Sequence, residues 1–202
     1  RRALLAFAAA HDSAIVEDDY DSEFRFEARP LETLHCLDGT GRVVYVGTFS
    51  KSLLPGLRVG YVVSPPSLRD ALLAAHQLAD GHGPIHLQAA LARFLDEGLL
   101  ARHVRHARAV YADRRAILLD ELAALPVSVV PSSAGLHLTA RLPDGADDRA
   151  IAARAAAAGI ALDAVSAYAA DGLGAPGLVL GYGAAGTGAI RPGIRRLARL
   201  LG

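Results

Sequence analysis

The chain has 202 residues, which is enough for one substantial domain or for one and a half small ones. Its 21 basic and 21 acidic side chains cancel, so the composition excludes the strongly positive surface typical of nucleic-acid-binding domains. The single cysteine, Cys36, excludes an intrachain disulfide and a cysteine metal cluster, and no apolar run is long enough for a membrane span.

The first predicted elements are a helix and a strand followed by acidic residues. Residues 1–10 have the pattern of an amphipathic helix, and residues 14–16 that of a short buried strand. Because the sequence starts without methionine inside this helix, we expect an upstream part of the protein. Carboxylates of residues 17–21 follow the strand, where α/β folds bind ligands. A solvated acidic turn is the alternative.

The only lysine of the chain, Lys51, follows the next predicted strand, residues 43–46. The other 20 residues counted as lysine or arginine are all arginine. An amine that loses its proton can form a Schiff base with a carbonyl compound, which a guanidinium cannot do. The sequence therefore indicates that Lys51 was kept for its chemistry. An ordinary surface lysine is the alternative.

The residues around Lys51 indicate what it could bind. Thr48 and Ser50 precede it, and Arg58 follows it, ahead of a β-like run at residues 59–63. A hydroxyl-lined loop with one lysine and one arginine suits a phosphate and an aldehyde on the same small molecule.

This loop resembles the pyridoxal-phosphate lysine segment of fold-type I aminotransferases. The shared pattern is S/T-x-S-K-x-x-x-P-G-x-R-x-G, which residues 48–60 match. With the segment IVEDDYDSEFRF at residues 15–26 and the segment GLHL at residues 135–138, the chain resembles the aminotransferase-like domain of MocR/GabR-type regulators of the GntR superfamily. The resemblance covers essentially the whole chain.

The resemblance implies pyridoxal 5'-phosphate as the cofactor and assigns a role to each candidate residue. Lys51 would form the internal aldimine, and Asp18 would keep the pyridine nitrogen protonated, so these two are the expected catalytic residues. Tyr20 would hydrogen-bond the ring hydroxyl. The phosphate would be held by three side chains: Arg58, Thr48 and Ser50.

Helical patterns dominate the middle of the chain, and an α+β pattern follows. Helices are expected at residues 68–79, 87–95 and 101–125. Histidines in this region lack a third ligand at suitable spacing, so no metal site is predicted. Beyond residue 126 the pattern predicts strands at 127–130, 136–142, 160–165 and 178–181, and helices at 147–158 and 194–201.

The last predicted strand departs from the aminotransferase pattern. Fold-type I aminotransferases usually carry an arginine there that binds the substrate α-carboxylate, and the matching residue here is Val179. A valine cannot form that bidentate pair. We therefore expect ordinary amino-acid transamination to be weak or absent.

Together these observations predict an α/β fold that is part of a fold-type I pyridoxal-phosphate-dependent transferase. The later strands of the large-domain mixed sheet would lie in residues 1–80, a linking helical segment in 81–125, and a small α+β C-terminal domain in 126–202. The rest of the cofactor site would lie upstream, so we expect these residues alone to hold the cofactor poorly.

The resemblance implies the effector domain of a MocR-type transcriptional regulator. Such a protein would be a cytoplasmic homodimer that responds to a small amine or amino acid, and it would contact DNA only through an upstream winged helix-turn-helix domain. The alternative is a genuine aminotransferase of class I or II. An upstream winged helix-turn-helix would favour the regulator, and its absence would favour the enzyme.

Overall fold

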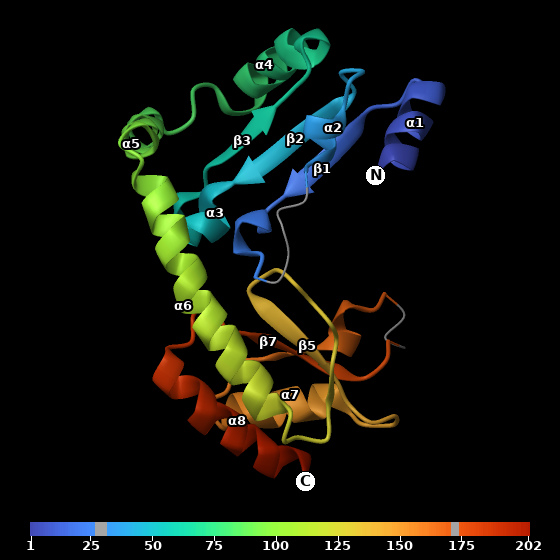
Figure 1. The fold of residues 1–202 in the computed structure, drawn as a ribbon, viewed down its shortest axis with the longest axis vertical. Helices are drawn as coiled ribbons and strands as arrows, with labels where there is room; N and C mark the ends of the chain where they lie inside the picture. Colours follow the sequence, from blue (N-terminus) through green and yellow to red (C-terminus); the bar gives the residue numbers. More distant parts are fainter. Residues whose placement is uncertain (27–31, 171–173) are drawn as a thin grey trace. The chain divides into compact units, whose positions relative to one another are not determined.

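The computed structural model describes residues 1–26, 32–170 and 174–202, which fall into two compact units (Figure 1). Unit 1 comprises Arg1–Glu23 and Arg29–Arg105, and unit 2 comprises Phe24–Ala28 and His106–Gly202. The long helix α6 (Leu99–Leu122) contains the boundary between them. None of the helices in the described ranges is both long and apolar enough to cross a membrane.

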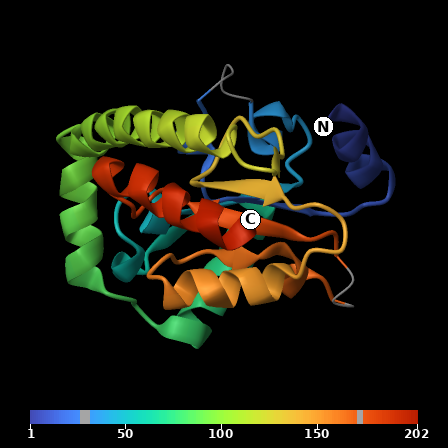
Figure 2. The ribbon, with the colours of Figure 1, turned by 90° about the horizontal axis from the view of Figure 1, so that it is seen from below.

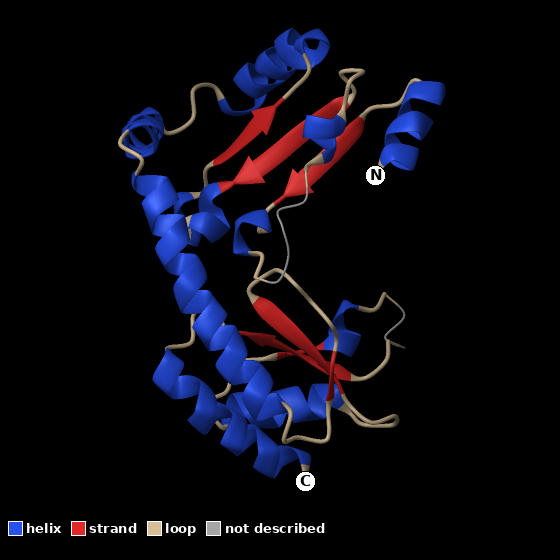
Figure 3. Cartoon of the chain, viewed as in Figure 1, coloured by secondary structure: helices blue, strands red, loops and turns tan. Residues whose placement is uncertain are grey.

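Unit 1 contains a mixed three-stranded sheet in the order β1-β2-β3. Strand β1 (Ile15–Asp19) runs parallel to β2 (Val43–Thr48), and β3 (Gly60–Val63) runs antiparallel to β2 (Figure 3). Parallel strands end on the same side of a sheet, and an antiparallel neighbour begins on that side. The carboxyl ends of β1 and β2 and the start of β3 therefore share one end of this sheet.

Short and longer helices precede, connect and follow the strands of this sheet along the chain. The short ones are α2 (Leu34–Leu37), α3 (Phe49–Ser52), and the 3-10 turns η1 (Ser22–Phe24) and η2 (Pro55–Leu57). The longer ones are α1 (Arg2–Ala10), α4 (Pro66–Asp80) and α5 (Ile85–Asp96). Neither α4 nor α5 contains a buried residue. Unit 1 buries little of its own apolar surface.

Unit 2 contains a four-stranded antiparallel sheet in the order β4-β5-β7-β6. Its strands are β4 (Ser128–Val129), β5 (His137–Arg141), β6 (Asp163–Ala164) and β7 (Gly177–Gly181). Helices α7 (Asp148–Ala157) and α8 (Thr187–Leu201) lie side by side against it (Figures 1 and 2), and the 3-10 turn η3 (Val165–Tyr168) follows β6.

The core of unit 2 joins this sheet to two helices. It contains Leu118 and Leu122 of α6, strand residues such as Leu138 and Leu178, and Leu197 of α8. Each of these five side chains is at most 3% exposed. Unit 2 thus has a closed hydrophobic core of its own.

Three elements of the structure correct the sequence prediction. Strand β1 continues through Asp19, so Glu17, Asp18 and Asp19 lie within the strand, and of the acidic residues at 17–21 only Asp21 follows it. Lys51 lies in the short helix α3, where the sequence predicted a strand end and a loop. Helix α8 begins at Thr187, whereas its predicted start was residue 194; Pro192 lies inside the helix, a position where proline is usually disfavoured.

A fourth correction concerns the strand predicted at residues 160–165, of which only Asp163–Ala164 pair in the sheet. The N–H of Ile160 donates to the carbonyl of Ala155 at 2.9 Å, and Gly159 has a positive φ of 74°. This is the hydrogen bonding of a glycine-terminated helix end. Ile160, the first residue of the predicted strand, therefore belongs to the hydrogen-bonded end of α7.

Candidate functional site

The candidate residues of β1 and β2 lie at the same end of the three-stranded sheet. Asp18 pairs with Val46 in the parallel register, Tyr20 directly follows β1, and Thr48 ends β2. Asp18 and Tyr20 are exposed, and Thr48 is half-buried. The parallel pairing thus brings together two segments that are far apart in the sequence, as an α/β ligand site requires.

The turn after β2 presents Lys51. The Thr48 hydroxyl oxygen accepts a hydrogen bond from the Ser50 N–H at 3.1 Å, which caps the start of α3. The Phe49 N–H donates to the Val59 carbonyl at 3.0 Å, so the turn is also fixed to the segment that leads into β3. The Lys51 side chain is exposed on this short, anchored helix.

Arg58 completes this end of the sheet. It lies between η2 and the first residue of β3, Gly60, and its side chain is exposed. Its backbone is left-handed, with φ 52° and ψ 39°, a conformation that non-glycine residues rarely adopt. The chain reverses direction here, which returns Arg58 to the end of the sheet where β2 finishes.

The acidic residues of β1 have different environments because side chains alternate along a strand. Glu17 accepts hydrogen bonds from two backbone N–H groups at the start of α2, at 2.8 and 2.9 Å. Asp19 accepts one from the Tyr45 hydroxyl at 2.7 Å and one from the Ser22 N–H at 3.1 Å. Asp18 points to the opposite face. Of the three, it is the carboxylate left available for a ligand.

Two cations and one anion at this end of the sheet have no partner among the residues that the structure describes. Within the described residues, the side chains of Asp18, Lys51 and Arg58 form no hydrogen bond or ion pair. Two cations and one anion, all exposed, suit a ligand that carries both a phosphate and a basic ring nitrogen. The donor set therefore fits pyridoxal phosphate.

Tyr45 and Tyr61, which lie close to this site, were not predicted from the sequence. Tyr45 and Tyr61 lie on the sheet face opposite Asp18, where Tyr45 binds Asp19 and the two tyrosine rings lie 6.1 Å apart. Strand alternation could have separated Asp18 from its neighbours, but no local sequence signal pairs Asp19 with Tyr45 or Tyr61. If β1 is extended to Asp19, Glu17 and Asp19 fall on one face and Asp18 on the other.

Val179 lies in unit 2, on strand β7 between Thr139 of β5 and Asp163 of β6. Its side chain is half-buried in the middle of the sheet. The apolar side chain suits this packed position.

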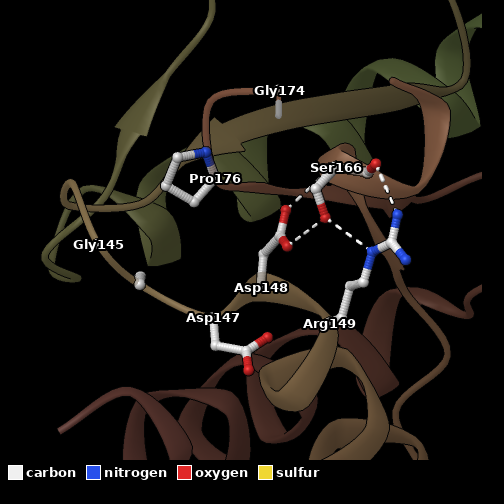
Figure 4. A pocket seen from close by; sticks show the side chains of 8 residues that line it. Gly145, Asp147, Asp148, Arg149, Ser166, Gly174 and Pro176 are labelled. Atoms are coloured by element: carbon white, nitrogen blue, oxygen red, sulfur yellow. Dashed lines mark hydrogen bonds between the residues drawn. The ribbon is translucent and has the colours of Figure 1, made fainter. Parts of the chain in front are cut away.

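Unit 2 also has a surface hollow of about 490 Å³ at the start of α7 (Figure 4). The Asp148 carboxylate there accepts hydrogen bonds from the hydroxyl and N–H of Ser166 and from the N–H of Gly177, at 2.5, 3.0 and 3.1 Å. Arg149 donates to the Ser166 hydroxyl and carbonyl oxygens, at 3.1 and 3.0 Å. These groups bind one another, so we assign them a structural role.

Comparison with known proteins identifies the family. The model of the family described as "Aminotransferase class I and II" matches residues 2–199. The chain belongs to this family. The fold class predicted from the sequence is confirmed, since aminotransferases of this family share the mixed α/β architecture described above.

Curated relatives of this aminotransferase-family chain include transcriptional regulators. It is 37% identical to the uncharacterized HTH-type transcriptional regulator YhdI of Bacillus subtilis over 98% of this chain. It is 36% identical, again over 98%, to the probable rhizopine catabolism regulatory protein MocR of Rhizobium meliloti. The chain spans only 43% and 41% of these relatives' lengths. The predicted resemblance to MocR-type regulators is confirmed.

A solved structure gives the same fold. The chain matches LysN, the alpha-aminoadipate aminotransferase of Thermus thermophilus, with a TM-score of 0.88 and 30% identity. The match covers 99% of this chain and 53% of LysN, which was crystallised in complex with N-(5'-phosphopyridoxyl)-L-leucine. The described fold is therefore about half of an aminotransferase chain.

Proposed function

We propose that this chain is the pyridoxal 5'-phosphate-binding, aminotransferase-like effector domain of a MocR-type transcriptional regulator. The observation that carries the proposal is the set Asp18, Lys51 and Arg58 at one end of the sheet, which has no partner in the described part of the chain, beside two carboxylates that bind protein groups. The regulatory names of YhdI and MocR support the regulator, and so does Val179 at the expected arginine position.

Lys51 holds the cofactor in this proposal. When bound, pyridoxal phosphate supplies an aldehyde carbon and an electron-withdrawing pyridine ring. The Lys51 amine, once it has lost its proton, would hold the cofactor through that aldehyde carbon with release of water, and no arginine of the chain could replace it in this role. Its exposed place on α3, capped by Thr48, leaves the amine accessible.

The remaining site residues orient the ring and the phosphate. Asp18 would hold a proton on the ring nitrogen, because its exposed carboxylate has no partner within the described ranges of the chain. Tyr20 donates a hydrogen bond to the ring hydroxyl oxygen. The phosphate is bound by three side chains: Arg58, Thr48 and Ser50.

The same proposal covers the rest of the protein. Residues 1–80 belong to the cofactor-binding large domain, 81–125 link the domains, and 126–202 form the small domain. The protein is a cytoplasmic homodimer whose upstream winged helix-turn-helix segment contacts DNA. A small amine or amino acid that binds at the cofactor shifts the equilibrium between two conformations.

The test of Lys51 uses the full-length protein incubated with pyridoxal phosphate and then reduced with borohydride. We expect a visible absorbance band before reduction and a trapped adduct on the peptide that contains Lys51. Lys51→Ala and Lys51→Arg should both abolish the adduct, and the arginine variant keeps the positive charge. The same adduct in Lys51→Ala would refute the assignment.

Asp18 can be tested against its neighbour. Asp18→Ala should weaken cofactor binding by roughly tenfold or more, because it removes a charge-assisted hydrogen bond to the ring. Asp19→Asn is the comparison and should weaken binding much less, since Asp19 faces away from the ring and the amide oxygen can still accept a hydrogen bond from Tyr45. Equal losses in the two variants would mean that the wrong carboxylate has been assigned to the ring nitrogen.

A genuine aminotransferase is the second candidate, because LysN matches 99% of this chain. Two assays on the full-length protein separate the candidates. Binding to DNA upstream of its own gene, changed by pyridoxal phosphate and an added amine, is expected for the regulator. Rapid turnover of amino acids without DNA binding would establish the enzyme.

A further inference from the structure

Three side chains form a cluster on the sheet face opposite Asp18, and we call Asp19, Tyr45 and Tyr61 the phenol cluster. The Tyr45 hydroxyl donates to Asp19 Oδ2 at 2.7 Å. The rings of Tyr45 and Tyr61 have centroids 6.1 Å apart and are inclined at 37°. Phe49 of α3 also packs against Tyr61, with centroids 5.3 Å apart. The cluster therefore contacts all three strands and the helix that carries Lys51.

Gly47 makes room for this cluster. The register aligns Asp19 of β1, Gly47 of β2 and Tyr61 of β3 in one row across the sheet. A Cβ atom at Gly47 would lie 2.3 Å from Tyr61 Cζ and 2.5 Å from its hydroxyl oxygen. No real Cβ contact is that short, so the Tyr61 ring can cover β2 only because residue 47 has no side chain.

The cluster adjoins the candidate cofactor residues in sequence. Asp18 and Tyr20 flank Asp19, and Thr48 follows Gly47. Asp19 also accepts the Ser22 N–H at 3.1 Å, which fixes the turn after β1 where Tyr20 lies. A hydrogen bond that joins β1 to β2 at this point limits how far Asp18 and Tyr20 can move relative to the Lys51 turn.

We propose that Asp19, Tyr45 and Tyr61 are positioning residues that hold Asp18 and Tyr20 in register with Lys51, so that they contact the cofactor ring correctly. This inference rests on the proposed function. The phenol cluster does not touch the cofactor. It acts from the opposite face of the sheet, through the backbone of β1.

Protonation keeps the cluster intact. Burial raises the pKa of Tyr45 well above its ordinary value, and the hydrogen bond to Asp19 and the nearby Tyr61 phenol raise it further. Tyr45 therefore remains a hydrogen-bond donor at every pH at which the protein is handled.

The test uses the full-length protein with pyridoxal phosphate and the variant Tyr45→Phe, which removes one hydroxyl and keeps the ring. We expect the adduct on Lys51 to form. Cofactor affinity should fall about three- to tenfold, since the net value of one hydrogen bond is of that order. The visible band should also change in position or in pH midpoint, because Asp18 and Tyr20 contact the groups that set the protonation of the ring. A merely structural role would not move the band.

Tyr168→Phe is the matched control. The Tyr168 hydroxyl also donates to an aspartate, Asp163 Oδ2, at 3.1 Å, but in unit 2. It should leave affinity and spectrum unchanged. A wild-type spectrum and affinity in Tyr45→Phe, or equal changes in Tyr45→Phe and Tyr168→Phe, would overturn the inference while leaving the proposed function standing.

Two further variants test the same contacts by other routes. Gly47→Ala displaces the Tyr61 ring and should change the band in the same direction as Tyr45→Phe. Asp19→Asn keeps an acceptor and should retain more affinity than Asp19→Ala; the reverse order would overturn the positioning role.

If the wild-type protein forms no adduct at all, the proposed function fails, and this inference fails with it.

Discussion

The two units differ in how many of their apolar side chains are buried. Unit 2 buries a continuous cluster between its four-stranded sheet and helices α6 and α8. Fourteen large apolar side chains of the described residues are exposed. Thirteen of them belong to unit 1, and only Tyr168 belongs to unit 2. In β3 all four residues are exposed, and α4 and α5 bury none.

This difference indicates that unit 2 contributes mainly to the stability of the fold and unit 1 mainly to ligand binding. Unit 2 holds the closed core, but its polar groups at the α7 hollow bind one another. Unit 1 holds the unpaired charges, on a sheet whose faces are only partly covered within these residues. Changes in unit 2 should therefore affect folding, and changes in unit 1 should affect binding.

The sharpest test of this contrast is a pair of leucine truncations. Leu197→Ala in unit 2 should cost about 2–5 kcal/mol, because its fully buried side chain would leave a cavity. Leu78→Ala in unit 1 should cost less than about 0.5 kcal/mol, because Leu78 is 90% exposed. Urea unfolding measures both. Similar losses at the two positions would break the comparison.

An assay of transamination tests whether the protein can act on amino acids. The arginine that usually binds the substrate carboxylate is replaced here by Val179. Loss of a bidentate charged contact costs on the order of 2–4 kcal/mol, which is roughly 30- to 1000-fold in kcat/KM. We therefore expect the full-length protein to turn over alanine, aspartate and glutamate slowly or not at all. Ordinary aminotransferase rates in a coupled assay would contradict the regulator assignment.

Asp148 tests whether the polar groups of unit 2 serve folding. Asp148→Ala should destabilise the protein by about 2–3 kcal/mol, because three buried hydrogen bonds to Ser166 and Gly177 lose their acceptor. The control is Asp147→Ala, which removes only the cap of α7 and should cost about 1 kcal/mol. Cofactor binding should be unchanged in both variants. A loss of binding without a loss of stability would show that the hollow serves binding.

The same carboxylate gives a smaller, pH-dependent effect. Burial alone would raise the pKa of Asp148, but the hydrogen bonds from Ser166 and Gly177 outweigh it and hold the pKa below its ordinary value. A folded-state pKa below the unfolded one means that the stabilisation is complete above the unfolded value, about 3.9, and is lost as pH falls through the folded value. The stability difference between wild type and Asp148→Asn should therefore be constant from about pH 7 to 5 and shrink below about pH 4. A difference that grows on acidification would reverse this sign.

The sequence predicted the segments of unit 1 better than their internal geometry. The order of strands and the lysine turn follow from short apolar runs and from the spacing of Lys51 and Arg58, which are local signals. The extension of β1 to Asp19 depends on pairing with Gly47, and the burial of Tyr45 depends on Asp19. Such contacts between distant segments leave no periodic pattern in either segment, so the phenol cluster could not be predicted.

In unit 2 the errors had local causes. Helix α7 ends before Gly159, and the N–H of Ile160 donates a hydrogen bond to this helix end, which shortens the following strand to Asp163–Ala164. The start of α8 was missed because Gly188 and Pro192 disfavour a helix by propensity. Packing of Ile190 and Ile194 into the core overrides that preference.

The left-handed backbone of Arg58 has a consequence for protein engineering. A side chain in this conformation costs about 1 kcal/mol, a cost that glycine does not have. Replacement by glycine would relax the backbone and also remove a cation from the phosphate site. Selection for thermal stability and selection for cofactor retention would therefore favour different residues at this one position.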